Sequence, residues 1–168
     1  MTYPRRSFDV DAYVERVRSQ DCFICRIVAG DLDAHAEIYR DEVCIAFLAQ
    51  WPTLVGYTLV APLAHRTRVV DDFTADEYRD LHGRMHAIGR AVERAVPTER
   101  LYVLSLGAND GNAHVHWHLA PLPPGVPYEE QQYAALMHET HGYYDVPVAD
   151  QRRIAADIAA HIEIPGAR

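Results

Sequence analysis

Short apolar runs bounded by turn residues recur along the chain and predict the strands of a sheet. Two runs flank the Asp41-Glu42 turn, and a third ends at Pro62. The predicted strands cover residues 36–40, 43–48, 57–62 and 101–106. Their hairpin-like spacing favours antiparallel pairing.

Apolar residues at steps of three and four predict helices between and around these strands. The strongest pattern runs from Thr74 to about Val96, and its Thr74–Glu77 pair has the spacing of a capping box. Shorter helices are predicted near residues 9–19, 128–138 and 150–162. One long helix beside a run of strands indicates an α+β fold.

The segment from His114 to His118 alternates histidine with apolar residues and reads His-Val-His-Trp-His. Successive side chains of a strand point to opposite faces, so this pattern predicts a fifth strand with its three histidines on one face. The intervening apolar residues would pack on the core while the imidazoles line a cleft. Imidazole is well suited to proton transfer, nucleophilic attack and metal binding near neutral pH.

This segment resembles the motif of the histidine-triad (HIT) family, His-φ-His-φ-His-φ-φ with φ apolar, and matches it completely through Ala120. The likeness continues upstream, in the same order, through Cys22-Phe23-Ile24-Cys25, Ile45-Ala46-Phe47-Leu48, Gly56-Tyr57-Thr58-Leu59-Val60 and Pro62-Leu63-Ala64-His65. It covers about residues 21–122 and implies a HIT-like fold. Such a fold has a five-stranded antiparallel sheet with one long packed helix and is commonly a homodimer.

The resemblance also suggests how the chain is organised. We expect an N-terminal helical arm at 1–20, the HIT domain at 21–122, and a C-terminal helical extension at 123–168 packed on the same domain.

The family pattern implies a role for each histidine of the triad. The middle one, His116, would attack the α-phosphorus of a nucleoside phosphate anhydride, ester or phosphoramide and carry the nucleotidyl group. His118 would bind the non-bridging phosphate oxygens, and His114 would either orient His116 or bind a metal ion. Transfer to water would make the protein a hydrolase, and transfer to a phosphorylated acceptor a nucleotidyltransferase. A nucleotide-binding or interaction protein without turnover is a third interpretation.

Several positions around the triad bear on substrate recognition. Ala49 stands where the family usually has an acidic residue that binds the ribose, and Tyr57 stands where it has a histidine. Gln50 or Asn109 could take over the ribose contact. Asn112 precedes the triad as in the galactose-1-phosphate uridylyltransferase-like branch and is a further substrate-binding candidate. The residues that match the base-binding slot of the family are Ile24, Ile27, Phe47 and Leu48.

Cys22 and Cys25 have the Cys-x-x-Cys spacing of a zinc knuckle, which is also compatible with a redox pair or two buried thiols. In the HIT branches that carry zinc, the other ligands are a middle histidine and the first histidine of the triad. Those roles fall on His65 and His114. The resemblance therefore implies a structural zinc ion bound by Cys22, Cys25, His65 and His114.

The remaining cysteine and histidines have simpler interpretations. Cys44 lies on a predicted buried strand and is expected in the core. His82 and His86 are one helical turn apart without the intervening glutamate of a metalloprotease helix, so they predict a solvated helix face. The segment with His138 and His141 is interpreted as a polar connector in preference to a substrate lid.

Composition excludes several classes of partner. The 168 residues carry a net charge of −8, which argues against binding a nucleic acid polymer, because such binding needs a basic face. The apolar runs are too short to cross a bilayer, and acidic residues interrupt the N-terminal segment where a secretory signal would be apolar. Three cysteines do not make a disulfide framework. We therefore expect a cytoplasmic protein that binds a small nucleotide.

Overall fold

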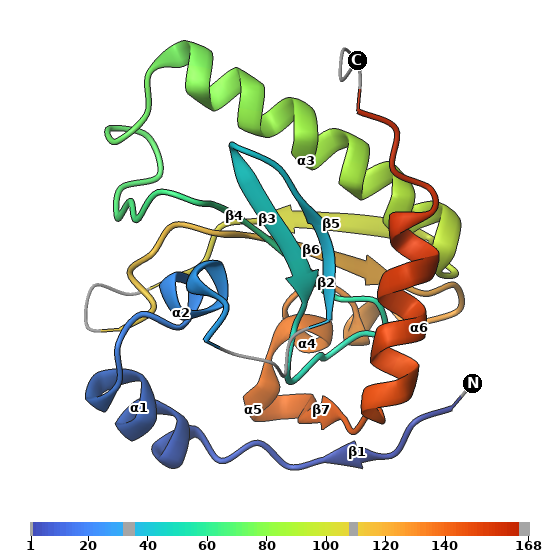
Figure 1. Ribbon diagram of the computed structural model, residues 1–168. Helices are drawn as coiled ribbons and strands as arrows, with labels where there is room; N and C mark the ends of the chain where they lie inside the picture. The colour runs from blue at the N-terminus through green and yellow to red at the C-terminus, as the bar shows by residue number, and fades with distance from the viewer. Residues whose placement is uncertain (1, 32–35, 108–110, 165–168) are drawn as a thin grey trace.

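The centre of the protein is a five-stranded antiparallel sheet with the strand order β2-β3-β4-β6-β5 (Figure 1). The computed structural model describes residues 2–31, 36–107 and 111–164. The strands are β2 (Glu37–Arg40), β3 (Cys44–Leu48), β4 (Thr58–Pro62), β5 (Arg100–Leu104) and β6 (Trp117–Leu122). The predicted α+β class and the five-stranded antiparallel sheet are confirmed.

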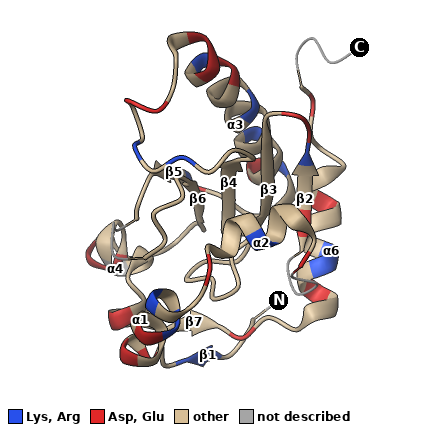
Figure 2. Ribbon diagram, turned by 60° about the vertical axis from the view of Figure 1, so that its left-hand side comes forward, with Lys and Arg blue, Asp and Glu red and all other residues tan. Residues whose placement is uncertain are grey.

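Alternating side chains divide the core into two layers, one on each face of the sheet. On one face, Ala46 and Leu48 of β3 pack with Ile88 of α3 (Ala75–Ala95) and with Ile158 of α6 (Val148–Ala159). On the other face, Ile45 and Phe47 pack with Ile24 and Ile27 of α2 (Phe23–Ala29). Strands β3 and β4 are fully buried and carry no charged residue, whereas charged residues gather on α1, α3 and α6 (Figure 2).

The capping box that was predicted for the long helix is present. The Thr74 hydroxyl accepts a hydrogen bond from the Glu77 amide, and the Glu77 carboxylate accepts one from the Thr74 amide at 2.8 Å. Further along the helix, Arg84 forms ion pairs with Asp41 and Glu42 in the turn between β2 and β3. Its side chain is only 12% exposed, so these contacts fix α3 to one end of the sheet.

The other helices differ in part from the prediction. Helix α1 (Val10–Ser19) begins after the Asp9 cap, as expected, whereas α2 was not anticipated. The single helix predicted near 128–138 is wrong. The structure has three short pieces there: the 3-10 turn η1 (Tyr128–Glu130), α4 (Tyr133–Leu136) and α5 (His138–His141). Gln132 has a φ of 55° and a ψ of −118°, outside the right-handed helical region, so a continuous helix is interrupted there.

A second, two-stranded sheet joins segments near the two ends of the chain and was not predicted. Strand β1 (Arg5–Arg6) pairs antiparallel with β7 (Tyr143–Tyr144), below the main sheet in Figure 1. Arg5 lies over the Tyr144 ring at 4.1 Å, and Arg6 pairs with Asp145 at 3.0 Å. No helix within the described ranges has the length and apolar character that a membrane crossing requires.

We expect Gly142→Ala to disrupt the β1–β7 pairing. Gly142 has a φ of +62°, and an added Cβ would lie 1.9 Å from the backbone oxygen of Arg6. Backbone cannot move aside as a flexible side chain does, so the free energy of unfolding should fall by about 1–3 kcal/mol. Denaturant unfolding and amide hydrogen exchange at Tyr143 and Tyr144 measure the effect.

Gly83→Ala is the matched control for this substitution. Gly83 lies in α3, and its added Cβ would meet nothing within 4 Å. The free energy of unfolding of this variant should therefore rise by about 0.5–1 kcal/mol. A Gly142→Ala protein with unchanged stability and exchange would contradict the prediction.

Candidate active site and metal centre

Strand β6 begins at Trp117, so the prediction that His114 and His116 lie on the same regular strand as His118 is wrong. The β4–β6 register pairs Val60 with Trp117, and its continuation would place Pro62 opposite Val115. Proline has no N–H, so the Val115 carbonyl would find no donor in that pair. The Val115 amide donates to the Arg66 carbonyl at 2.7 Å and not to Pro62, and the regular pairing ends.

The alternation of faces nevertheless continues through the irregular part of the segment. Val115 and Trp117 join the core layer under α3, as predicted. His114 is 1% exposed and His116 is 5% exposed, so these two imidazoles are buried instead of lining an open cleft. The rings of His116 and His118 lie 4.8 Å apart, centroid to centroid. The structure therefore brings the second and third histidines of the triad into contact.

Hydrogen bonding fixes the tautomer of His116. Its Nδ1 lies 2.7 Å from the backbone oxygen of His114. A carbonyl only accepts, so Nδ1 must carry the proton. Burial lowers the pKa of His116, while the His114 carbonyl opposes that effect, so the ring is neutral near pH 7. In a neutral ring protonated at Nδ1, the lone pair is on Nε2, where a nucleophile would need it.

His118 has a different environment, which includes a residue that the sequence analysis did not assign. The Tyr57 hydroxyl lies 3.2 Å from Nδ1 of His118. Burial and the neighbouring His116 lower the pKa of His118 to about 3, with a small opposing effect from the Leu106 carbonyl. Its Nε2 atom is buried and makes no hydrogen bond within the described part of the chain.

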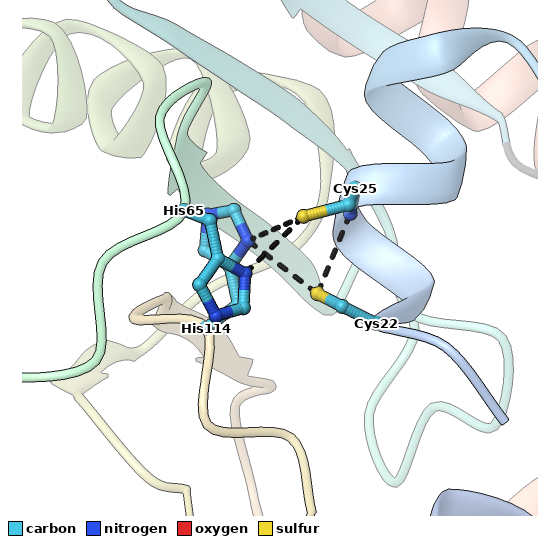
Figure 3. Close-up of side chains that lie close together, drawn as sticks. All are labelled: Cys22, Cys25, His65 and His114. Atoms are coloured by element: carbon cyan, nitrogen blue, oxygen red, sulfur yellow. Dashed lines mark hydrogen bonds between the residues drawn. The ribbon is translucent and has the colours of Figure 1, made fainter.

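The structure brings Cys22, Cys25, His65 and His114 together, with all four ligand atoms within 4.8 Å of one another (Figure 3). The two cysteines come from the start of α2, His65 from the segment after β4, and His114 from the segment before β6. Nδ1 of His114 lies 3.5 Å from each sulfur, and Nδ1 of His65 lies 3.2 Å from Cys25. These residues could hold a metal ion.

A second hydrogen bond aims His114 at this cluster. Its Nε2 lies 3.0 Å from the Pro62 carbonyl, so Nε2 carries the proton and the lone pair of Nδ1 faces the two sulfurs. The ring of His114 thus belongs to the Cys/His cluster, while its backbone carbonyl orients His116. The geometry is compatible with both roles expected for His114, the orientation of His116 and the binding of a metal ion.

The predicted substrate-binding residues do not form one group. Ile24, Ile27 and Phe47 pack together in the layer under α2, whereas Leu48 faces the layer under α3. Gln50 is exposed after β3. Two asparagines complete the set. Asn112 donates its side-chain amide to the Tyr13 hydroxyl, and Asn109 lies outside the described residues.

The predictions for the remaining cysteine and histidines are confirmed only in part. Cys44 is fully buried, which confirms its place in the core. His86 is exposed, but His82 is stacked on Tyr78 at 4.0 Å and packs against Trp117. The interpretation of His82 as part of a solvated face is therefore wrong. His138 is also in contact with other elements, because it stacks on Phe8 at 4.5 Å and hydrogen-bonds the Trp51 carbonyl at 2.7 Å.

Sequence reasoning missed three residues that contact the triad. The Ser105 hydroxyl donates to the backbone oxygen of His116 at 2.8 Å, and the Phe23 ring lies 6.2 Å from the His116 ring. Tyr57 is the third, and it alone had a signal in the sequence, because it stands where the family usually has a histidine. It lies two positions before Leu59, the residue opposite His118, and residues two apart in a strand share a face.

A profile of the HIT domain matches residues 33–124, more than half of the chain, and this chain belongs to that family. It is 26% identical to an uncharacterised HIT-like protein of Saccharolobus solfataricus over 127 residues, which are 74% of this chain and 90% of that one. It is 34% identical to an uncharacterised HIT-like protein of Mycobacterium tuberculosis over 110 residues, which are 60% and 70% of the two chains.

Solved structures agree on the fold. A hypothetical histidine triad nucleotide-binding protein from Sulfolobus tokodaii has a TM-score of 0.64 at 20% identity, covering 83% of this chain and 92% of that one. A zinc-bound histidine triad family protein from Mycobacterium smegmatis has a TM-score of 0.63 at 24% identity, covering 83% and 94%.

The low pKa of His118 predicts a loss of stability in acid. Its pKa is about 3 in the folded protein, against about 6.5 in an unfolded chain. Between those values the unfolded state binds a proton that the folded state does not, so the free energy of unfolding falls as the pH falls. For His118 alone, the loss from about pH 7.5 to about pH 5 should be roughly 2 kcal/mol.

Urea unfolding at the two pH values measures this dependence. His118→Gln should reduce it by that amount, because glutamine does not titrate. His86→Gln, at an exposed position of α3, is the control variant. An equal pH dependence in His118→Gln and the natural protein would show that His118 titrates normally when folded.

Proposed function

We propose that this protein is a nucleotide-binding enzyme that cleaves a nucleoside phosphate anhydride, ester or phosphoramide at the α-phosphate. His116 would act as the nucleophile through a covalent nucleotidyl intermediate. The hydrogen bond from Nδ1 of His116 to the His114 carbonyl carries this proposal, because it leaves the lone pair on Nε2. Membership of the HIT domain family supports it, as does the fold shared with the nucleotide-binding protein of Sulfolobus tokodaii.

In the first step, Nε2 of His116 attacks the α-phosphorus and a nitrogen–phosphorus bond forms. The bond to the leaving group breaks, and its electron pair departs with that group, which takes a proton from solvent. The imidazole then carries a positive charge. Its Nδ1–H is already bonded to the His114 carbonyl, an acceptor that stabilises the charged ring.

In the second step, water attacks the phosphorus from the side opposite the histidine. Its oxygen bonds to phosphorus, its proton goes to solvent, and the electron pair of the nitrogen–phosphorus bond returns to Nε2. His118 would stabilise both steps by binding the non-bridging oxygens, where charge develops. A phosphorylated acceptor in place of water would make the protein a nucleotidyltransferase, and the Asn112-x-His114-x-His116 sequence favours that alternative.

The substrate base would lie on the α2 side of the triad, where the predicted slot residues Ile24, Ile27 and Phe47 pack. The Phe23 ring links that layer to the triad, because its centroid is 6.4 Å from Phe47 and 6.2 Å from His116. A base bound in this position would take the place of contacts that these side chains make with one another in the free protein.

Zinc is the metal that we propose for the Cys/His cluster. Two thiolates and two imidazoles make a Cys₂His₂ set, and the ligand atoms of a tetrahedral zinc lie roughly 3.3–3.8 Å apart. The distances of 3.2–3.5 Å between Nδ1 atoms and sulfurs are close to that range. Bound there, zinc would join α2 to the segments after β4 and before β6, a structural role that also holds the His114 backbone.

A homodimer, a cytoplasmic location and the three-part domain organisation stay predictions. The first and the last have direct tests. Light scattering gives the oligomeric state, and limited proteolysis locates the segment boundaries.

His116→Ala should abolish turnover while the fold persists. Removing a covalent nucleophile should lower kcat by several orders of magnitude, since the remaining groups only bind and polarise the substrate. Hydrolysis of nucleoside phosphoramidates that carry a radioactive α-phosphate measures turnover, and acid-quenched protein reports the labelled intermediate. His86→Ala, at an exposed helix position, is the control. Near-normal activity or labelling in a folded His116→Ala protein would remove His116 from this role.

We also expect one zinc ion per chain by elemental analysis. Cys22→Ser and His65→Ala should each lose the ion together with thermal stability, because a structural zinc contributes directly to the free energy of folding. Cys44→Ala is the matched control, since Cys44 is a buried thiol outside the cluster. Protein that is purified without chelator and contains no metal, with unchanged stability in both ligand variants, would defeat the zinc proposal.

A further inference from the structure

Tyr57, which directly precedes β4, supplies the side-chain hydrogen bond to the His118 ring. Its side chain is 7% exposed, and its ring meets the imidazole edge-on at 5.7 Å. Nδ1 of His118 is therefore held by the Tyr57 hydroxyl at 3.2 Å, while Nε2 is buried without a partner among the described residues.

The position of one proton decides what His118 can do. Burial keeps the pKa of His118 low and raises the pKa of Tyr57, so both side chains are uncharged near neutral pH. A neutral imidazole has a single N–H. If that proton is on Nε2, the unpartnered atom is a hydrogen-bond donor, and if it is on Nδ1, the same atom is an acceptor.

Two arrangements satisfy the contact between the two side chains. In the first, the Tyr57 hydroxyl donates to Nδ1 and the imidazole proton is on Nε2. In the second, Nδ1–H donates to the hydroxyl oxygen, which leaves both the hydroxyl hydrogen and the Nε2 lone pair without partners among the described residues. The first arrangement leaves only one polar group unpaired. Each unpaired buried polar group is costly, so the first is favoured.

We propose that Tyr57 is a positioning residue that fixes His118 as its Nε2–H tautomer. His118 then presents a neutral donor to a non-bridging phosphoryl oxygen, while His116 presents a lone pair to the phosphorus. The assignment of a phosphoryl oxygen as the acceptor rests on the proposed function. The tautomer itself is a property of the free protein and can be tested without any substrate.

The first experiment reads the tautomer directly. In protein labelled with nitrogen-15 in histidine, long-range proton–nitrogen correlation spectra distinguish protonated from unprotonated ring nitrogens. The His118 signals are those lost in His118→Gln. We expect Nε2 to be protonated in the natural protein and the proton to shift towards Nδ1 in Tyr57→Phe, which keeps the ring and removes the hydroxyl.

Tyr39→Phe is the matched control. It removes a half-buried hydroxyl that donates to Asp41 at 2.8 Å and should leave the His118 signals unchanged. Protonation of Nδ1 in the natural protein would overturn the proposal, and so would a His118 spectrum that is identical in Tyr57→Phe. Either result would stand whether or not the protein turns over a nucleotide.

The second experiment separates positioning from a general structural role. With a nucleoside phosphoramidate as the probe, Tyr57→Phe should lower kcat by about 10- to 100-fold and change KM by less than about threefold. In a His118→Gln protein, the side-chain amide donates without help from Tyr57. Adding Tyr57→Phe to that protein should therefore change kcat by less than about twofold. Equal losses in the two backgrounds would show that Tyr57 does not act through His118. Absence of turnover in the natural protein would count against the proposed function alone, and the spectra would still decide the tautomer.

Discussion

The missing N–H of Pro62 is the constraint on which the arrangement of the site depends. Regular pairing between β4 and the triad segment ends beside it, and the Val115 amide turns to Arg66. The Pro62 carbonyl then accepts the Nε2–H of His114 at 3.0 Å. Pairing of β6 with β5 ends at His118, and the His114 carbonyl beyond that point accepts a hydrogen bond from the His116 ring at 2.7 Å.

One residue, His114, links the Cys/His cluster to the candidate nucleophile. Its side chain faces the sulfurs of Cys22 and Cys25, and its backbone oxygen accepts from His116. A shift of α2 would move the sulfurs and, through the His114 ring, the carbonyl that sets the His116 tautomer. The position of the Cys/His cluster therefore affects the orientation of His116 through the His114 backbone.

Local sequence rules predicted the parts of the molecule that depend on local contacts. The Thr74–Glu77 box lies within one helical turn, and the alternation from His114 to His118 has the two-residue period of an extended chain. Both could therefore be predicted directly from the sequence. The four-residue Cys/His cluster could be predicted only from the family resemblance, because His65 and His114 are far from the cysteines in sequence. The broken helix near Gln132 and the stacking of His82 on Tyr78 could not be predicted, since tertiary packing outweighs helix periodicity there. The contact between Tyr57 and His118 depends on a strand register that only the folded chain reveals.

The pairing of β1 with β7 has a consequence for the order of events in folding. Contacts across it join residues 139 positions apart, such as Arg6 and Asp145, so a very long loop must close before they form. Only two residues of each strand take part, and their ion pair is largely exposed. We expect such a contact to form late, after the sheet and α3. Segments 5–6 and 143–144 should then separate together, as one unit.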